Sequence, residues 1–493
     1  MEVSDQPPTK IFVSIGYLGS NVSSKEREAQ GSKLGMFYQS VTNCLLRRGN
    51  FSQSKKEKKV TAATGEAKAT WWRRLKKMKG SRFPDLILGG ACGHGIPYRR
   101  LSSSSSTYPK TLVNYYRGFE VICRKTKMVE TLRSMFTAQE LSTFLPESFL
   151  FYPARTELNE TDLFVEVFDA DINQSGRSLW ICKPSDGSKG RDIFVTEDKE
   201  EILSMFASPL AGEDLITLKK TAANTAKTKD DNLSNFADWK ISQSKSSTGN
   251  IAWVVQKYVQ NPMLLNGQRK FDMRLWVLVD HQYDIYIHQE FVLRTTSVPY
   301  TTDKEALRND FIHLSNHCIQ LQSEQYGQYE TTNEMFRDEF SAWLSKHYLV
   351  QRNNTTTSTG KPPFAAQQQQ TNSDSSQEQK CEEWCSASFD EDIMPQLKRI
   401  VAMTLHAARS QIENLPGASY ASFNLFGFDF MIDDVMKVHL LEINSSPAVA
   451  DRLLETITQD VVDLAIHSYY DDDKNNNTKI ENGFCQVDCQ KWM

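Results

Sequence analysis

Apolar residues along this chain follow two periods, one typical of strands and one typical of helices. Short apolar or alternating runs predict strands at residues 11–15, 83–88, 180–184, 252–259, 271–280, 285–293, 426–432 and 438–444. Apolar residues that recur on one helical face predict helices at residues 34–45, 119–132, 393–412 and 449–464. Helices that pack on antiparallel strands in this way predict an α+β fold.

Polar, low-complexity stretches interrupt these elements at residues 219–249 and 353–380. Both are expected to be exposed insertions within a domain rather than domain boundaries. The rest of the chain is expected to divide into three domains and a tail. The predicted units are a small α/β domain at 1–110 with a basic insertion at 50–80, a central domain at 111–255, a C-terminal domain at 256–470 and a polar tail at 471–493.

The composition is that of a globular protein. Hydrophobic residues make up 39% of the 493 positions and charged residues 24%, which is enough apolar material for a large core. No apolar run approaches the ~18 residues of a membrane-spanning helix, and the polar start MEVSDQPPTK has no apolar signal core. Nine scattered cysteines, including the pairs Cys381/Cys385 and Cys485/Cys489, fit free thiols better than a zinc site. We therefore expect a cytoplasmic protein without a membrane segment.

The charge is unevenly distributed along the chain. The formal net charge is −4, yet the segment Lys55–Lys79 holds ten Lys or Arg and two Asp or Glu, a local charge of +8. A basic segment in an acidic protein indicates an acidic partner, such as an acidic protein tail or nucleic acid, although a solvated insertion loop explains the same charges. No helix-turn-helix, zinc-finger or RNA-recognition signature accompanies the segment, so nucleic acid is not the expected partner.

Basic residues and glycines meet in a loop between two predicted strands. Lys183 lies near the end of the first strand, and Lys189 and Gly190 follow within the turn. Glycine lets backbone N–H groups approach an anion and lysine neutralises it, so the loop is typical of a flexible phosphate cover. A plain charged hairpin would have the same sequence. Farther along, Gln256 and Lys257 end an apolar strand, where backbone groups can face a purine edge.

A row of charged residues lies inside an otherwise apolar strand. Strand alternation places Lys270, Asp272 and Arg274 on one face, and apolar residues on the other. Such a row costs free energy unless a polar ligand binds there or the charges neutralise each other in salt bridges. The strand alone leaves both interpretations open.

The last two predicted strands bring oxygen ligands together. Glu442 and Asn444 share one face of their strand, and a short hairpin turn places Asp429 opposite Glu442 or one diagonal pair away. Two carboxylates on one face repel each other without a cation, and oxygen ligands suit an Mg²⁺ ion that bridges nucleotide phosphates. The alternative is that each carboxylate is paired independently.

The order of these features resembles the ATP-grasp superfamily: a basic glycine loop, a purine-edge strand, a Lys/Asp/Arg strand, and an Asp followed by Glu-x-Asn. Within that superfamily, the chain resembles the tubulin tyrosine ligase-like family. The segments that carry the resemblance occur in the family's order at residues 112–125, 144–149, 152–153, 180–183, 189–190, 254–259, 269–280, 292–295, 313–320, 326–336, 423–433 and 440–448.

The resemblance implies an ATP-grasp ligase fold with a small N-terminal domain, and ATP between the central and C-terminal domains. The implied phosphate ligands are Lys125, Lys183, Lys189 and Gly190. The implied adenine contacts are Gln256, Lys257, Tyr258 and Val259, and the implied contacts of the ribose and phosphate end are Lys270 and Asp272. The implied Mg²⁺ ligands are Asp429, Glu442 and Asn444, of which Glu442 is also expected to be catalytic. The implied substrate contacts are Arg274 and Arg294, which would grip carboxylates in catalysis, and Ser315 and Asn316.

The implied activity is that of a ligase that adds tyrosine to the C-terminal glutamate of detyrosinated α-tubulin. The acceptor carboxylate would take the γ-phosphoryl group of ATP, and the amine of tyrosine would displace phosphate from that acyl phosphate. Two alternatives stay open: a glutamate or glycine ligase of the same family, and a non-catalytic tubulin-binding protein. The protein is expected to act on the cytoskeleton in the cytoplasm, with tubulin as its partner and otherwise as a monomer.

Overall fold

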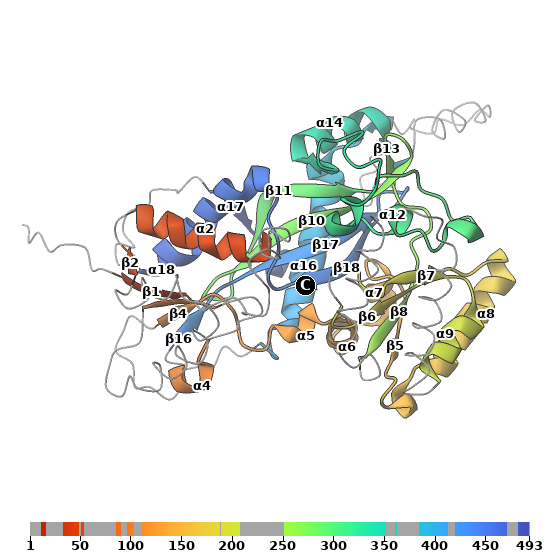
Figure 1. Ribbon diagram of the computed structural model, residues 1–493, viewed down its shortest axis with the longest axis horizontal. Coiled ribbons are helices and arrows are strands. Elements are labelled where there is room, and N and C mark those ends of the chain that lie inside the picture. Colours follow the sequence, from red (N-terminus) through yellow and green to blue (C-terminus); the bar gives the residue numbers. More distant parts are fainter. Residues whose placement is uncertain are drawn as a thin grey trace, which may run out of the picture.

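The structure is a computed structural model that describes residues 11–15, 33–48, 51–53, 85–89, 96–102, 111–187, 189–207, 251–351, 360–361, 384–412, 420–470 and 482–492. Four β-sheets with helices around them build this part of the chain (Figure 1). The combination of antiparallel sheets, a parallel sheet and packed helices confirms the predicted α+β fold class.

The largest sheet lies at the centre of the molecule (Figure 1). Its strand order is β12 (Glu334–Phe336), β11 (Ile285–Thr295), β10 (Arg269–Val279), β17 (Asn424–Ile432) and β18 (Val438–Asn444), with β9 (Leu264–Leu265) beside β10 and β19 (Phe484–Gln486) beside β11. All of these pairs are antiparallel. Phe271, Met273 and Leu275 of β10 share a core with Leu397 and Val401 of helix α16 (Met394–Ala408). One face of β10 therefore packs in the core against α16, and the charged residues of β10 lie on its other face.

A smaller antiparallel sheet lies beside the central one (Figure 1). Its order is β5 (Ser148–Phe151), β8 (Trp253–Lys257), β6 (Trp180–Pro184) and β7 (Phe194–Thr196). Helices α8 (Thr161–Ser175) and α9 (Lys199–Phe206) cover it through an aromatic core, in which the rings of Phe164 and Trp180 meet edge to face at 5.2 Å. Helix α8 ends at Gly176, whose φ of 72° is the left-handed conformation that glycine adopts without strain.

The N-terminal sheet is parallel and takes strands from both ends of the chain. Its order is β16 (Tyr420–Ser422), β4 (Thr111–Val113), β3 (Leu86–Leu88), β1 (Ile11–Ile15) and β2 (Phe51–Gln53). Helix α2 (Lys33–Arg47) lies along helix α17 (Leu454–Val461), and Val41 and Leu45 share a core with Ile457 and Val461 (Figure 1). The N-terminal sheet is thus joined to the C-terminal part of the chain by both a strand and a helix.

Shorter elements connect these layers. A small sheet has the order β14 (Gly360–Lys361), β13 (Leu349–Gln351) and β15 (Trp384–Ser386), next to helix α14 (Arg337–His347). Other α-helices are α4 (Tyr98–Leu101), α7 (Ala138–Ser142), α12 (Asp310–His313), α13 (His317–Gln320) and α18 (Ser468–Tyr470). The 3₁₀ turns are η2 (Thr156–Leu158), η4 (Lys304–Ala306), η6 (Asp451–Leu453) and η8 (Cys489–Lys491), and the π turns are η5 (Phe389–Ile393) and η7 (Val462–His467).

Two predicted helices are not continuous. The helix expected after Gly118 breaks into α5 (Glu120–Cys123) and α6 (Lys125–Arg133), because Arg124 between them is extended. The break turns the start of α6 toward the β6–β7 loop, where the Lys125 ammonium donates to the Gly187 carbonyl at 3.1 Å. The helix expected at 449–464 is a succession of η6, α17 and η7. Apolar periodicity predicted the buried faces but not these changes of helical pitch.

The predicted domain boundaries remain predictions, although the sheets cross them. Strand β8 spans the boundary expected at 255, β4 and β16 complete the N-terminal sheet from outside 1–110, and β19 lies within the expected tail. The basic segment Lys55–Lys79 and the insertion 219–249 lie outside the described residues. Only β14 is described within the insertion 353–380.

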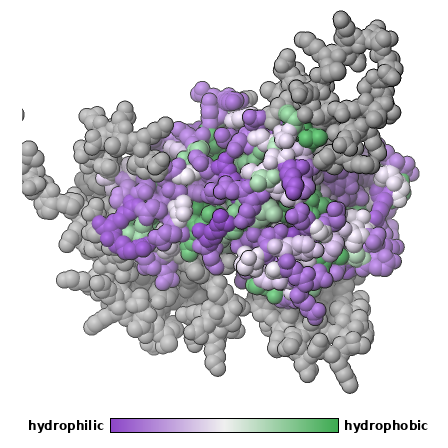
Figure 2. Space-filling model, turned by 90° about the horizontal axis from the view of Figure 1, so that it is seen from above, coloured by the Kyte–Doolittle hydropathy of each residue, from purple (hydrophilic) through white to green (hydrophobic). Residues whose placement is uncertain are grey.

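The surface of the described residues is largely polar. Hydrophilic side chains cover much of the face shown in Figure 2, and hydrophobic residues appear between them in small groups. Within the described ranges, no helix combines the length and the apolar character that crossing a membrane requires.

Candidate functional site

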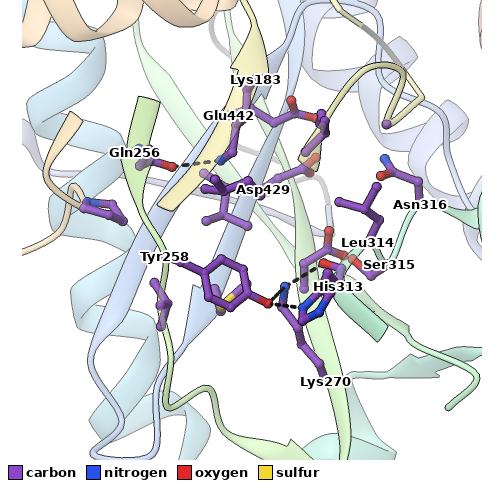
Figure 3. A pocket seen from close by; sticks show the side chains of 18 of the residues that line it. Lys183, Gln256, Tyr258, Lys270, His313, Leu314, Ser315, Asn316, Asp429 and Glu442 are labelled. Atoms are coloured by element: carbon purple, nitrogen blue, oxygen red, sulfur yellow. Dashed lines mark hydrogen bonds between the residues drawn. The ribbon is translucent and has the colours of Figure 1, made fainter. Parts of the chain in front are cut away.

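A cleft that is open to solvent lies where the β5–β8–β6–β7 sheet faces the central sheet (Figure 3). It collects most of the residues that the sequence analysis singled out. The predicted residues that line it are Lys125, Lys183, Lys189, Gly190, Gln256, Lys257, Tyr258, Val259, Lys270, Asp272, Arg294, Ser315, Asn316, Asp429 and Glu442. Arg274 and Asn444 are not among the lining residues, but both contact Asp429. Residues distant in sequence therefore meet in one place, and their individual roles remain predictions.

Strand register explains how the charged row on β10 meets the other strands. In the antiparallel ladders, Asp272 lies opposite Arg294 of β11, and Arg274 lies opposite Asp429 of β17. Opposed side chains on one face of a sheet are in contact distance. The predicted face of Lys270, Asp272 and Arg274 is therefore the face that points into the cleft region.

A bulge in β18 places Glu442 beside Asp429. Asp429 pairs with Glu442, but the next residue of β17, Phe430, pairs with Leu440. Leu441 is thus an extra residue in β18, and both Leu441 and Glu442 line the cleft. The predicted opposition of Asp429 and Glu442 is confirmed.

Two arginines neutralise the buried carboxylates on β10 and β17. Arg294 forms a bidentate pair with Asp272, at 2.7 and 2.6 Å, and its Nη2 also donates to Asp429 Oδ2 at 2.9 Å. Arg274 forms a second bidentate pair with Asp429, whose Nη2–Oδ2 distance is 2.8 Å. Gly427 makes room for this pair, because a Cβ there would lie 3.0 Å from Cδ of Arg274 and 2.6 Å from Pro447. Asp272 and Arg274 are therefore neutralised by salt bridges to residues of β11 and β17, and not by each other as the self-neutralising interpretation of the row supposed.

Glu442 is neutralised by a lysine rather than by an arginine. The Lys125 ammonium lies 3.0 Å from Glu442 Oε2. Burial raises the pKa of Glu442, but Lys125, Lys183 and Arg274 outweigh burial, so the pKa lies well below its usual range. The expected repulsion between the two carboxylates is therefore relieved without a metal ion, because Lys125, Arg274 and Arg294 already offset their charge.

The donor chemistry around Asn444 nevertheless fits Mg²⁺. Its side-chain amide lies 3.2 Å from Asp429 Oδ2 and 3.4 Å from Glu442 Oε1. In this arrangement Nδ2 of Asn444 donates to both carboxylates. With the amide turned over, Oδ1 would join the two carboxylates in an oxygen-only ligand set, which is the type that Mg²⁺ prefers. Among the described residues, no group of three or more His, Cys, Asp and Glu side chains could hold a metal ion.

Two buried lysines in the cleft carry charges that no carboxylate offsets directly. In the part of the chain that the structure describes, neither Lys183 nor Lys270 has a carboxylate within salt-bridge distance. Lys183 donates to the amide oxygen of Gln256 at 2.8 Å, and Lys270 to the carbonyl of His313 at 2.7 Å (Figure 3). Burial lowers the pKa of Lys183 to about 8 and that of Lys270 to about 7. Both ammonium groups would gain from an anionic ligand.

The side chains at the end of β8 do not point where a purine edge would require. Gln256 binds Lys183 through its oxygen and Ser148 through its nitrogen, at 2.9 Å. Lys257 forms an ion pair with Asp171 of α8 and lies 5.2 Å above the Trp180 ring. The backbone N–H groups of Lys257 and Tyr258 donate to the carbonyls of Glu147 and Leu179. Val259 lines the cleft together with these three residues, and the adenine contacts of this segment remain predictions.

The β6–β7 loop rests against the segment that carries Ser315 and Asn316. Lys189 and Gly190 both have positive φ values, of 61° and 70°. A Cβ at Gly190 would lie 2.5 Å from Cδ1 of Ile319 and 2.9 Å from Oδ1 of Asn316. Glycine is therefore required for the loop to approach this segment so closely.

The sequence patterns did not indicate the apolar side chains that line the cleft, nor His313. The lining residues that it did not single out include Ile181, Ile193, His313, Leu314, Met431 and Leu441. Strand alternation would have found two of them, since Ile181 lies two residues before Lys183 and Met431 two residues after Asp429. No such rule indicates Leu441, because the bulge in β18 interrupts the alternation.

The amino-acid sequence of the chain is similar to one protein family and to several individual proteins. A family model described as "Tubulin-tyrosine ligase family" matches residues 102–396 and 365–478. Tubulin glycylase 3C of Tetrahymena thermophila is 28% identical over 62% of this chain and 22% of its own length. The protein polyglycylase TTLL10 of Macaca fascicularis is 26% identical over 67% of this chain and 43% of its own length. The human probable tubulin polyglutamylase TTLL2 is 24% identical over 74% of this chain and 48% of its own length. The chain therefore spans less than half the length of each of these three relatives.

Proposed function

Because the chain belongs to the tubulin-tyrosine ligase family, we propose that it is an ATP-dependent ligase that joins an amino acid to a carboxylate of tubulin. The observation that carries this proposal is the excess of positive charge in and around the cleft. Five cations (Lys125, Lys183, Lys270, Arg274 and Arg294) surround three carboxylates (Asp272, Asp429 and Glu442). A buried lysine without a carboxylate partner costs free energy, and a bound triphosphate would supply the negative charge that offsets this cost.

The residues divide between the two ends of the nucleotide. Lys183 and Lys270 would bind phosphate oxygens, with Lys125 and Lys189 nearby, while Val259 would meet the base along the apolar wall. Asp429, Glu442 and Asn444 would hold Mg²⁺, which would offset phosphate charge during phosphoryl transfer. To bind Mg²⁺, the carboxylate oxygens of Asp429 and Glu442 would have to contact the metal as well as the arginine and lysine side chains that they pair with in the structure.

Of the two arginines, Arg294 is the one placed to hold a carboxylate substrate. Arg294 lines the cleft and Arg274 supports Asp429 behind it. A guanidinium that binds one carboxylate through Nε and Nη2 retains further N–H donors for another. The acceptor carboxylate would accept the γ-phosphoryl group from ATP, the incoming amine would displace phosphate, and an amide, ADP and phosphate would result. Ser315 and Asn316 would line the same reaction space.

We propose glycine or glutamate, rather than tyrosine, as the amino acid that is added. The relatives described above are named for glycine and glutamate transfer, which favours the alternative that the sequence analysis left open over its main interpretation. The intact set of Asp429, Glu442 and Asn444 favours a ligase over a protein that only binds tubulin.

The test is incubation of the full chain with tubulin, MgATP and labelled glycine, glutamate or tyrosine in parallel. Mass spectrometry of the tubulin tails then identifies the residue added and its point of attachment. We expect glycine or glutamate on a side-chain carboxylate. A single tyrosine at the main-chain terminus would restore the first interpretation, and no incorporation from any of the three would sink the proposed activity.

A further inference from the structure

Lys270 is held in the cleft by a chain of neutral hydrogen-bonding groups (Figure 3). Its ammonium donates to the Tyr258 hydroxyl at 3.2 Å and to the His313 carbonyl at 2.7 Å. Tyr258 Oη in turn lies 2.8 Å from His313 Nδ1. All three residues are buried, with at most 4% of their surface exposed. The adenine contact of Tyr258 remains a prediction, and its side-chain hydroxyl takes part in this chain of hydrogen bonds.

The direction of each hydrogen bond in this chain follows from the bond between His313 Nε2 and the Ala306 carbonyl. His313 Nε2 lies 3.1 Å from the Ala306 carbonyl oxygen, which can only accept, so Nε2 carries the proton. In a neutral imidazole, Nδ1 is then an acceptor, and the Tyr258 hydroxyl has to donate to it. The remaining lone pairs of that hydroxyl are turned toward the Lys270 ammonium.

We propose that Tyr258 and His313 are positioning residues, which direct the Lys270 ammonium toward an ATP phosphate through this ordered chain of hydrogen bonds. An ammonium has three N–H donors. Two of them are used by Tyr258 and His313, so the third is left for a ligand in the cleft. The inference rests on the proposed function, because it takes an ATP phosphate as the ligand of Lys270.

The protonation state of His313 supports this arrangement. Burial, together with the nearby Lys270 charge, lowers the pKa of His313 to about 4. The imidazole therefore stays neutral at physiological pH and keeps Nδ1 as an acceptor. A protonated ring would donate to Tyr258 and turn the hydroxyl hydrogen toward Lys270, which would oppose the ammonium.

Tyr258→Phe tests the hydroxyl alone, because it keeps the ring that lies 5.0 Å from the Lys270 ammonium. The affinities of the full chain for ATP and for uncharged adenosine are measured by titration calorimetry. We expect ATP affinity to fall about tenfold and adenosine affinity to stay within about twofold. Equal losses of affinity for ATP and adenosine would mean that Tyr258 only shapes the cleft, which would overturn the proposal. An unchanged ATP affinity would also overturn it.

A double-mutant cycle tests whether Tyr258 acts through Lys270. Lys270→Met should weaken ATP binding, and adding Tyr258→Phe to it should cause little further loss, since the group being positioned is gone. Independent, additive losses would overturn the proposal. Tyr283→Phe is the matched control, because the buried Tyr283 hydroxyl donates to a backbone carbonyl, that of Leu405, at 2.9 Å and is not part of the cleft.

The histidine is tested by rescue. His313→Asn can place an oxygen near the position of Nδ1, whereas His313→Leu offers no acceptor. We expect the asparagine variant to retain most of the ATP affinity that the leucine variant loses, and equal losses would contradict the role of His313. These binding measurements are separate from ligation. A wild-type chain that binds ATP but joins no amino acid would sink the proposed function alone, and a chain that does not bind ATP would sink both.

Discussion

At the scale of single residues, the cleft combines charges that are already paired with charges that are not. Asp272 and Asp429 have arginine partners and Glu442 has Lys125. Within the described ranges, Lys183 and Lys270 donate to neutral acceptors only. Removing a paired charge leaves its partner uncompensated in a buried site, which is costly. The two kinds of group should therefore respond differently to substitution and to pH.

Glu442→Gln should abolish most ligation without unfolding the protein. The change keeps the side-chain volume but removes a proposed Mg²⁺ ligand and the partner of Lys125, so we expect activity to fall on the order of 100-fold or more. The measurement is ligation rate against Mg²⁺ concentration, with circular dichroism as the check on folding. Glu455→Gln is the matched control, because Glu455 is exposed and pairs only with Arg47 at the surface. Normal ligation by Glu442→Gln at limiting Mg²⁺ would refute the metal assignment.

ATP binding should take up protons at about pH 8. Burial holds the pKa of Lys270 at about 7 and that of Lys183 at about 8 in the free protein, and a bound phosphate should raise both. Binding then protonates these lysines, so ATP affinity should fall as the pH rises above about 8. Calorimetry in buffers of different ionisation enthalpy measures the uptake. Lys270→Met should reduce it, and binding without proton exchange at pH 8 would contradict the expected protonation.

The charged residues of the site could be found from sequence, but the direction of several side chains could not. Strand alternation was sufficient for Lys270, Asp272 and Arg274, because one strand fixes its own faces. The orientations of Gln256 and Lys257 depend on partners that come from other elements, Lys183 on β6 and Asp171 on α8. No local pattern carries that information.

At the scale of elements, the β6–β7 loop is positioned by contact as well as by its own conformation. Gly190 combines a positive φ with close approach to Ile319 and Asn316. Gly176, at the end of α8, has nearly the same φ of 72°, but a Cβ there would meet nothing within 4 Å. A comparison of substitutions at these two glycines can therefore separate the effect of backbone strain from the effect of steric contact.

Gly190→Ala should therefore weaken ATP binding more than it weakens the fold. The added methyl group has to push Ile319 or the loop aside, which would displace Lys189 from the cleft. Gly176→Ala should cost roughly 1 kcal/mol of folding stability through its positive φ and leave nucleotide affinity unchanged. Thermal unfolding and ATP titration of both variants make the comparison. Equal ATP affinities for the two variants would show that the loop contact is not needed.

The longest strands could be predicted from sequence, and many short strands and the interruptions of helices could not. The expected strand at 180–184 matches β6, and the expected strand at 438–444 matches β18, because each is a short apolar run next to clear turn residues. The extended Arg124 between α5 and α6 follows instead from contacts of Lys125 with Gly187 and Glu442, which are distant in sequence. A long-range contact of this kind overrides local helix propensity.

At the scale of the whole molecule, the first and last parts of the chain share one core. Phe37, Val41 and Leu45 of α2 lie in the same buried cluster as Ile457 and Val461 of α17. The N-terminal α/β unit is thus not packed as a separate body, whichever residues are taken as its boundary.

Leu45→Ala should lower the stability of the whole described fold in one transition. Leu45 is fully buried, and its truncation should cost about 2–5 kcal/mol. Because the core is shared, the main thermal transition should move as a unit. Leu163→Ala is the control, since Leu163 on α8 is 57% exposed and should change stability by less than about 0.5 kcal/mol. A separate early transition in Leu45→Ala, with the rest unchanged, would show that the N-terminal unit unfolds alone.

The pairing of β4 with β16 has a consequence for biosynthesis. Thr111–Val113 emerges early from the ribosome, but its partner Tyr420–Ser422 is made about 300 residues later. At about 5–20 residues per second, the edge of β4 would wait on the order of 15–60 s for its neighbour. During that interval the nascent chain would present an unpaired strand edge next to apolar residues such as Leu112, a target for chaperones and for aggregation. Production of this protein in a foreign host should therefore improve when chaperone capacity is raised.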